Sequence, residues 1–203
     1  MPTAFGVLVS GNGTNLQAIL DACMRGTLDA RVSCVISNRM QAFALERASR
    51  AHVPAIAIPH QGFESREAFD RAVVAALRQH GVEWVVLAGF MRLITPELLR
   101  AFPGRLVNIH PSLLPAFPGV AAPRQALAHG VKVTGCTVHF VDEGVDSGPI
   151  IAQRAVPVLE GDDEARLSAR IHEAEHELFV SVLQDIATGR ILPASPANRP
   201  RLP

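Results

Sequence analysis

The sequence predicts an α/β protein: a Rossmann-like, open, mostly parallel twisted sheet with helices on both faces and an antiparallel C-terminal strand pair. In the first 110 residues, short apolar runs alternate with longer segments whose apolar residues recur at helical spacing. These apolar runs lack polar alternation, which is typical of parallel strands covered on both faces. Two further β-like runs then follow each other without a helix between them, which indicates an antiparallel hairpin.

The alternation defines the parallel part element by element. Apolar runs predict strands at residues 4–10, 32–37, 54–58, 82–88 and 105–109. Helical spacing predicts helices at residues 15–25, 41–51 and 66–80, and Thr95 with Pro96 starts a short fourth helix. The ligand crevice of such a sheet lies outside the carboxyl ends of its strands. Asn108 and His110 are therefore expected at that edge.

The remaining elements complete a single domain. Residues 133–141 and 149–158 predict the antiparallel pair, joined by the turn DEGVDSG, and residues 162–187 predict a long final helix. The sequence shows no internal repeat and no interdomain linker. One domain is expected over residues 1–189, followed by a proline-rich tail at residues 190–203.

Composition narrows the class of protein. Lys and Arg number 19, as do Asp and Glu, so the charge balance does not favour nucleic acid or an acidic membrane as partner. Cys23, Cys34 and Cys136 lie far apart, without the spacing of a metal site or a disulfide framework. The N-terminus lacks signal-peptide features, and no apolar run approaches the roughly 20 residues of a membrane helix. We expect a cytoplasmic protein without a bound metal.

The segment SGNGTNLQ, residues 10–17, joins the first predicted strand to the first helix. Gly11 and Gly13 allow close backbone approach, and the amides at the start of the helix favour an anion such as a phosphate. Leu16 replaces the third glycine of the dinucleotide fingerprint, and the Lys of a P-loop is absent. The segment indicates a phosphomonoester-bearing substrate, with an ordinary glycine-rich turn as the alternative.

A polar set follows the later strands. Asn108 can donate an amide N–H to an oxygen that develops negative charge, and His110 can exchange a proton near neutral pH. Asp146 lies in a glycine-rich loop from which its carboxylate can reach His110 and favour the charged ring. Asp142 and Glu143 remain alternatives for this acid. Asn108 and His110 could also be purely structural.

Six segments carry a resemblance to a known family, and they cover nearly the whole chain in order: SGNGTNLQAIL, SREAFDRAV, VVLAGFMRLITPELL, GRLVNIHPSLLPAFPG, GCTVHFVDEGVDSGPIIAQ and AEHEL. Together they resemble the phosphoribosylglycinamide formyltransferases, folate-dependent enzymes of purine synthesis. The resemblance implies transfer of a formyl group from the co-substrate 10-formyltetrahydrofolate to the amine of 5-phosphoribosylglycinamide (GAR). It implies no metal, and a monomer or a homodimer.

The resemblance also implies roles for individual residues. The catalytic group is Asn108, His110 and Asp146. The residues for the substrate phosphate and ribose are Gly13, Thr14, Asn15 and Glu175. The folate residues are Arg66, Met91, Arg92, Leu93, Ile94 and Asn108. On this basis the phosphate-binding half spans about residues 1–104 and the folate and catalytic half about residues 105–189. Residues 120–123, Val-Ala-Ala-Pro, depart from relatives with His or Asp there, so loop 119–124 is expected to contact the folate or close differently.

Two other enzyme classes, and one class without catalysis, compete with this interpretation. A formyltetrahydrofolate hydrolase shares the polar set but uses water as acceptor. A zinc peptidase is suggested by HEAEH at residues 172–176, a literal H-E-x-x-H match. That motif needs a third ligand, yet the segment after the final helix contains no His, Asp or Glu, and Asp185 is too far along the same helix. A folate- or nucleotide-binding module without catalysis would not need Asn108, His110 and Asp146 together.

Overall fold

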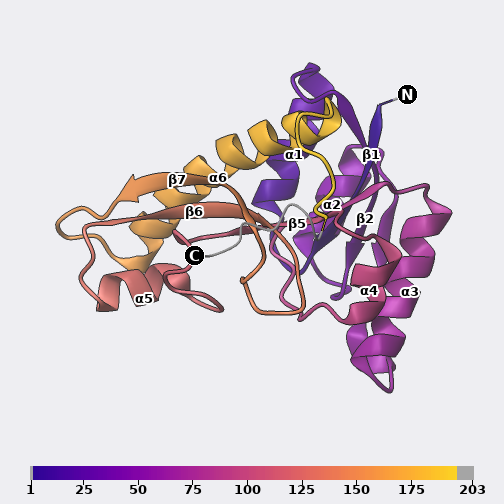
Figure 1. Cartoon of the computed structure of the whole chain (residues 1–203), viewed down its shortest axis with the longest axis horizontal. Helices are drawn as coiled ribbons and strands as arrows, with labels where there is room; N and C mark the ends of the chain where they lie inside the picture. The colour runs from indigo at the N-terminus through magenta and orange to yellow at the C-terminus, as the bar shows by residue number, and fades with distance from the viewer. Residues whose placement is uncertain (1, 196–203) are drawn as a thin grey trace.

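The computed structural model describes residues 2–195, whose strands form one seven-stranded sheet in the order β3-β2-β1-β4-β5-β6-β7 (Figure 1). The parallel strands are β1 (Thr3–Val9), β2 (Ala30–Ser37), β3 (Ala55–Ala57), β4 (Trp84–Leu87) and β5 (Leu106–His110). The antiparallel strands are β6 (Val133–Phe140) and β7 (Ile150–Pro157). The predicted fold class is confirmed.

Helices cover both faces of this sheet. They are α1 (Thr14–Arg25), α2 (Phe43–Arg50), α3 (Arg66–Gln79), α4 (Pro96–Ala101), α5 (Ala122–Ala128), α6 (Glu164–Ala187) and the 3₁₀ turn η1 (His60–Gly62). Residues of β1 alternate between two apolar clusters. Phe5 and Val7 belong to the cluster that includes α1 and α6, whereas Leu8 belongs to the cluster that includes α3 and α4. Burial on both faces explains why β1 is apolar throughout.

Side-chain caps fix where three helices begin. Ser65 accepts a hydrogen bond from the Ala68 N–H at α3, and Thr95 accepts one from the Glu97 N–H at α4, where Pro96 occupies the first turn. Asp163 accepts a hydrogen bond from the Arg166 N–H at 2.8 Å and caps α6. Caps of this kind satisfy amides that have no partner within the helix. The polar residues before each helical pattern therefore set its start.

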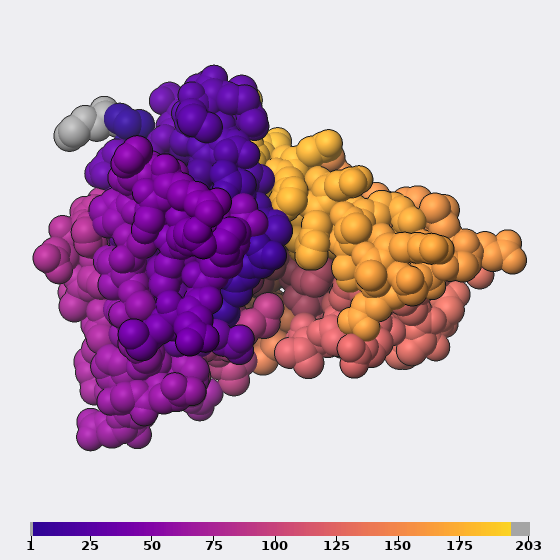
Figure 2. Space-filling model, turned by 180° about the vertical axis from the view of Figure 1, so that it is seen from behind, coloured from indigo at the N-terminus to yellow at the C-terminus, as the bar shows by residue number. Residues whose placement is uncertain are grey.

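The strand order reverses at β1, which pairs with β2 on one side and with β4 on the other. A topological switch of this kind opens a crevice beyond the carboxyl ends of the strands. In Figure 2 the N-terminal and C-terminal parts of the chain lie side by side, and the surface is hollowed where they meet. The sheet thus brings the segment after β1, the segment after β4 and the end of β5 to one place.

The structure departs from the predicted elements mainly after β5. Helix α5 begins at Ala122, so half of the expected loop at residues 119–124 is helical. Seven residues give too short a pattern for helical periodicity to reveal, although Pro123 lies in its first turn, where proline is favoured. His110 is the last residue of β5 rather than the residue after it.

In the predicted tail, the Ala194 N–H donates to the Gly104 carbonyl at 2.9 Å, and residues 196–203 lie outside the described residues. The division of residues 1–189 into two functional halves stays a prediction. Within residues 2–195, no helix is long and apolar enough to cross a membrane.

Candidate active site

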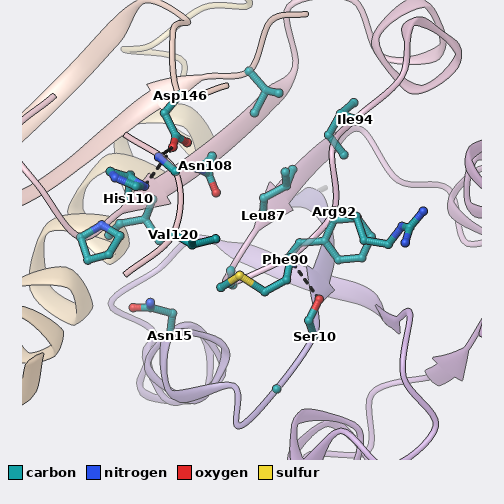
Figure 3. Close-up of a pocket in the computed structure, with 18 of the residues that line it drawn as sticks. Ser10, Asn15, Leu87, Phe90, Arg92, Ile94, Asn108, His110, Val120 and Asp146 are labelled. Atoms are coloured by element: carbon teal, nitrogen blue, oxygen red, sulfur yellow. Dashed lines mark hydrogen bonds and ion pairs between the residues drawn. The ribbon is translucent and has the colours of Figure 1, made fainter. Parts of the chain in front are cut away.

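A cavity of about 790 Å³ opens at the carboxyl edge of the sheet. Its walls come from the loop between β1 and α1, the segment after β4, the end of β5, the loops at residues 119–121 and 141–146, and one face of α6. In the close-up of Figure 3, Asn108, His110 and Asp146 cluster on one side, and Ser10, Phe90 and Arg92 lie on another. The polar residues predicted from distant segments therefore meet in one cavity.

The glycine loop enters α1 with a left-handed backbone at Gly13, where φ is 77°. A Cβ at this position would lie 2.6 Å from the Cβ of Ala44, so a side chain would meet both strain and a clash. Arg47 ties down the loop by donating to the backbone oxygen of Asn12 at 2.8 Å and to its side-chain oxygen at 2.7 Å. No side chain caps α1, so its first amides remain available for an anion.

Asn15 and Glu175, both predicted for the phosphate and ribose of the substrate, line the cavity and contact each other. Asn15 Nδ2 donates to Glu175 Oε2 at 2.9 Å. Burial raises the pKa of Glu175, while the hydrogen bond from Asn15 and the nearby His172 and His110 act in the opposite direction. Asn15 Oδ1 is buried and has no hydrogen-bond partner among residues 2–195. The pair therefore offers an acceptor for an N–H or O–H group of a ligand.

His110 is held between two acceptors. Its Nδ1 lies 3.3 Å from Oδ2 of Asp146, drawn as a dashed line in Figure 3, and its Nε2 lies 2.9 Å from the carbonyl oxygen of Phe117. A carboxylate and a carbonyl only accept hydrogen bonds, so a ring with N–H at both nitrogens satisfies them together. Asp146 also accepts from the Gly119 N–H at 2.8 Å, which fixes the carboxylate. Both ring nitrogens of His110 therefore face groups that accept hydrogen bonds.

The structure distinguishes the three candidate acids in the turn between β6 and β7. Asp142 Oδ1 accepts from the Gly144 N–H at 3.0 Å and from the Ser147 hydroxyl at 2.8 Å, so this carboxylate closes the turn. Glu143 is exposed. Asp146 is the acid that reaches His110, from a left-handed backbone with φ of 52°. Asp adopts this backbone more readily than most residues, and in this turn its carboxylate reaches His110.

Asn108 has a partner that sequence reasoning missed. Its Nδ2 lies 3.1 Å from Nε2 of His139, which is opposite Asn108 in the antiparallel pairing of β5 and β6. His139 is 2% exposed, and burial lowers its pKa. A lone histidine within an apolar strand gives no signal of its own. Only the register of the two strands would have revealed this contact.

The predicted folate segment lines the cavity with all four of its members, Met91, Arg92, Leu93 and Ile94. Two hydroxyl-bearing residues hold its ends. The Met91 N–H donates to Ser10 Oγ at 2.8 Å, and at the other end both the backbone N–H and the hydroxyl of Thr95 donate to Oδ2 of Asp70, each at 2.8 Å. The segment is therefore anchored to β1 and to α3.

Arg66 is the one predicted site residue that does not line the cavity. It is exposed at the first position of α3. Its folate role stays a prediction, without a contact in the cavity to support it. Conversely, the cavity includes residues for which no site role was predicted: Ser10, Arg39, His139, Val145 and His172. Residues 120–123, which were expected to alter the loop, contribute Val120 and Ala121 to the cavity, so the wall that this loop forms is apolar.

The HEAEH segment lies on α6, and its residues make different contacts rather than forming one site. Glu175 contacts Asn15, His172 lines the cavity, and the rings of His172 and His176 are stacked with centroids 6.5 Å apart. Among residues 2–195, no group of three or more His, Cys, Asp or Glu side chains could hold a metal ion. Nothing in this geometry favours a zinc peptidase.

Comparison with known proteins agrees with these features. Residues 4–183 match the family described as formyl transferase. The phosphoribosylglycinamide formyltransferase of Bacillus subtilis is 46% identical over 182 residues, which cover 90% of this chain and 93% of that protein. The trifunctional purine biosynthetic protein adenosine-3 of Drosophila pseudoobscura pseudoobscura is 49% identical over 91% of this chain, but this chain spans only 14% of that protein's length.

Solved structures give the same result. Glycinamide ribonucleotide transformylase 1 from Symbiobacterium toebii superposes with a TM-score of 0.93 at 54% identity, covering 96% of this chain and 92% of that one. The corresponding protein from Geobacillus kaustophilus gives 0.89 at 48% identity, covering 92% of this chain and 100% of that one. The family resemblance that the sequence motifs indicated is confirmed.

Proposed function

Because this chain belongs to the formyl transferase family, we propose that it transfers the formyl group of 10-formyltetrahydrofolate to the amine of GAR. The products are formyl-GAR and tetrahydrofolate, and the reaction belongs to de novo purine biosynthesis. One observation carries the proposal. Asn108, His110 and Asp146 lie in one cavity with a glycine loop suited to a phosphate and an anchored apolar segment suited to a folate ring.

The glycine loop and α6 hold the amine substrate. The free amides of α1 take the phosphate, where the helix dipole favours negative charge. Asn15 Oδ1 accepts a hydrogen bond from the substrate, and Glu175, which contacts Asn15, binds its ribose. Thr14, the first residue of α1, adds a hydroxyl that lines the cavity. This arrangement aims the amine away from the phosphate and into the cavity.

The folate occupies the other side of the cavity. Met91 and Leu93 are apolar residues exposed on its wall, where a flat heterocycle can cover them. Val120 and Ala121 extend this apolar wall. Burial of such surface contributes about 25 cal/mol for each Å² removed from water. We therefore assign part of the folate affinity to these exposed residues.

The chemical step is a direct transfer. The GAR amine attacks the formyl carbon and forms a tetrahedral intermediate whose oxygen carries negative charge. An N–H of Asn108 and the charged ring of His110 stabilise that oxygen. The bond to the folate nitrogen then breaks, this nitrogen gains a proton, and the former amine loses one. Asp146, whose Oδ2 lies 3.3 Å from Nδ1 of His110, orients the ring and places a carboxylate beside it.

Acceptor dependence tests the proposal. The purified protein is mixed with 10-formyltetrahydrofolate, and release of tetrahydrofolate is followed spectroscopically with and without GAR. Release that requires GAR and yields formyl-GAR is expected. Release without GAR would instead make the protein a formyltetrahydrofolate hydrolase, and binding without release would make it a folate-binding module. The cytoplasmic location and the monomeric or homodimeric state stay predictions.

A further inference from the structure

Asn108 and His139 face each other across the antiparallel pairing of β5 and β6, and Nδ2 of Asn108 lies 3.1 Å from Nε2 of His139. The two ends of a side-chain amide have nearly the same shape, so this contact alone does not establish which end faces the ring. The hydrogen that sits between the two residues decides it. Whether this hydrogen belongs to Asn108 or to His139 depends on the group that the other ring nitrogen of His139 contacts.

The other nitrogen, Nδ1 of His139, lies 2.8 Å from the carbonyl oxygen of Phe140. A carbonyl only accepts, so Nδ1 must carry the hydrogen. Burial lowers the pKa of His139 and favours the neutral ring. In a neutral ring with hydrogen on Nδ1, Nε2 is an acceptor. Nε2 therefore accepts from Asn108, and the amide nitrogen of Asn108 is fixed on the His139 side.

The charged groups around His139 act on its pKa in opposite directions. Asp146, whose Oδ1 lies 3.7 Å from Nε2, and Asp142 favour a protonated ring, whereas His110 and burial oppose it. In a protonated ring Nε2 would become a donor, and only the oxygen of Asn108 could face it. The amide of Asn108 would then present its ends in the reverse order. The protonation state of His139 thus determines the orientation of Asn108.

We propose that His139 is a positioning residue, whose hydrogen on Nδ1 fixes the Asn108 amide so that one N–H is bound to His139 and the second remains available to the cavity. The inference rests on the proposed function, in which this second N–H stabilises the oxygen of the tetrahedral intermediate. His139 contacts Asn108 rather than the reacting atoms. Its contribution is to turnover, through the orientation of its neighbour.

Two substitutions of the same residue separate this role from simple packing. In His139→Gln, the amide lies near the former Nε2 and can still accept from Asn108. In His139→Asn, the shorter side chain can still donate to the Phe140 carbonyl but withdraws the acceptor from Asn108. Misplacement of a stabilising donor costs on the order of a hundredfold in rate. We expect kcat to fall by at least about tenfold more in His139→Asn than in His139→Gln, with both KM values nearly unchanged.

Nitrogen-15 NMR of the histidine rings supplies a second measurement, independent of activity. His139 is assigned as the signal that is lost in His139→Gln. A protonated Nδ1 and an unprotonated Nε2 at neutral pH are expected. Hydrogen on Nε2, or a doubly protonated ring, would overturn the proposal, as would equal kcat values in the two folded variants.

The two proposals fail in different ways. If the unaltered protein releases no tetrahydrofolate, the proposed function fails, whereas the NMR signal still decides the tautomer of His139. If one variant does not fold, as judged by its thermal unfolding, the other variant assigns the His139 signal by its loss, and the NMR result on the unaltered protein then decides. If GAR-dependent transfer is intact and the Nδ1 hydrogen is absent, only the role of His139 is overturned.

Discussion

Asp146 Oδ2 lies 3.3 Å from Nδ1 of His110 and accepts a hydrogen bond from the Gly119 N–H at 2.8 Å, so one carboxylate oxygen joins His110 to the loop before α5. Asp146→Asn keeps the size of the side chain but removes its charge. We expect kcat to fall by about 10² to 10⁴, because the charged ring of His110 loses its counter-charge. The KM values should change little. Asp185→Asn, which alters a partly exposed partner of Arg190, is the control, and a kcat of Asp146→Asn equal to that of Asp185→Asn would contradict the assignment.

The contact between Glu175 and Asn15 leads us to expect that a change at Glu175 affects KM for GAR but not KM for the folate. Glu175→Gln replaces the carboxyl group that we assign to the ribose of GAR, so we expect KM for GAR to rise by about tenfold to a hundredfold while KM for the folate stays the same. Steady-state kinetics with each substrate varied in turn measures both values. Glu177→Gln on the same helix is the matched control, because the Glu177 side chain is 72% exposed. An equal rise for both substrates would argue against this contact.

The close packing at Gly13 leads us to expect that a single added methyl group disrupts binding of the substrate phosphate. In Gly13→Ala the new Cβ would meet Ala44 and the backbone would be strained, so the loop must shift. We expect KM for GAR to rise by at least about tenfold. Gly26→Ala is the control: Gly26 also has a positive φ, of 71°, but nothing lies within 4 Å of its Cβ position. If both variants bound GAR equally well, the loop would not be the phosphate site.

Asp70 predicts a pH-dependent stability of the folate segment. Burial is the main cause that raises the pKa of Asp70, against hydrogen bonds from Thr95 and the charge of Arg92. An Asp in the unfolded chain titrates near about 3.9. Above that pH the folded protein binds more protons than the unfolded chain, so its free energy of unfolding falls as pH rises through the raised pKa.

Two variants of Asp70 test this effect. Asp70→Asn keeps an oxygen for Thr95 but loses the charge, so its free energy of unfolding relative to the unaltered protein should be higher at about pH 7 than at about pH 4. Asp70→Ala leaves the Thr95 N–H buried without its partner, which costs about 1–3 kcal/mol. Urea denaturation at both pH values measures these differences. A pH-independent difference for Asp70→Asn would show that the folded protein does not raise the pKa of Asp70 above its value in the unfolded chain.

Much of the fold could be predicted because hydrophobic periodicity reports burial directly. Strand β1 is apolar on both faces, and α3 repeats its buried positions at helical spacing, so both patterns are clear from the sequence. Helix α5 has only seven residues and follows Ala121, whose positive φ of 55° no propensity predicts for alanine. Its formation depends on contacts with the rest of the fold.

The residues of the candidate site likewise fall into those that local sequence patterns reveal and those that only long-range contacts reveal. The position of Asn108 and His110 at the edge of the sheet could be predicted because polar residues at the end of a buried strand contrast with their surroundings. The choice of Asp146 over Asp142 could not, because it depends on the turn in which Asp142 accepts from Ser147. His139 required the pairing of β5 and β6, a long-range feature that one sequence does not reveal. Contacts between distant segments are what local patterns leave open.

The central claim, that formyl transfer to GAR takes place at His110, is tested most directly by His110→Ala. Its kcat for GAR-dependent release of tetrahydrofolate is measured together with the dissociation constants of both substrates. His52→Asn is the control, since His52 lies in an exposed turn. The account predicts a kcat lower by about 10² to 10⁴ with both dissociation constants nearly unchanged. A folded His110→Ala protein that transfers formyl groups as fast as His52→Asn would contradict it.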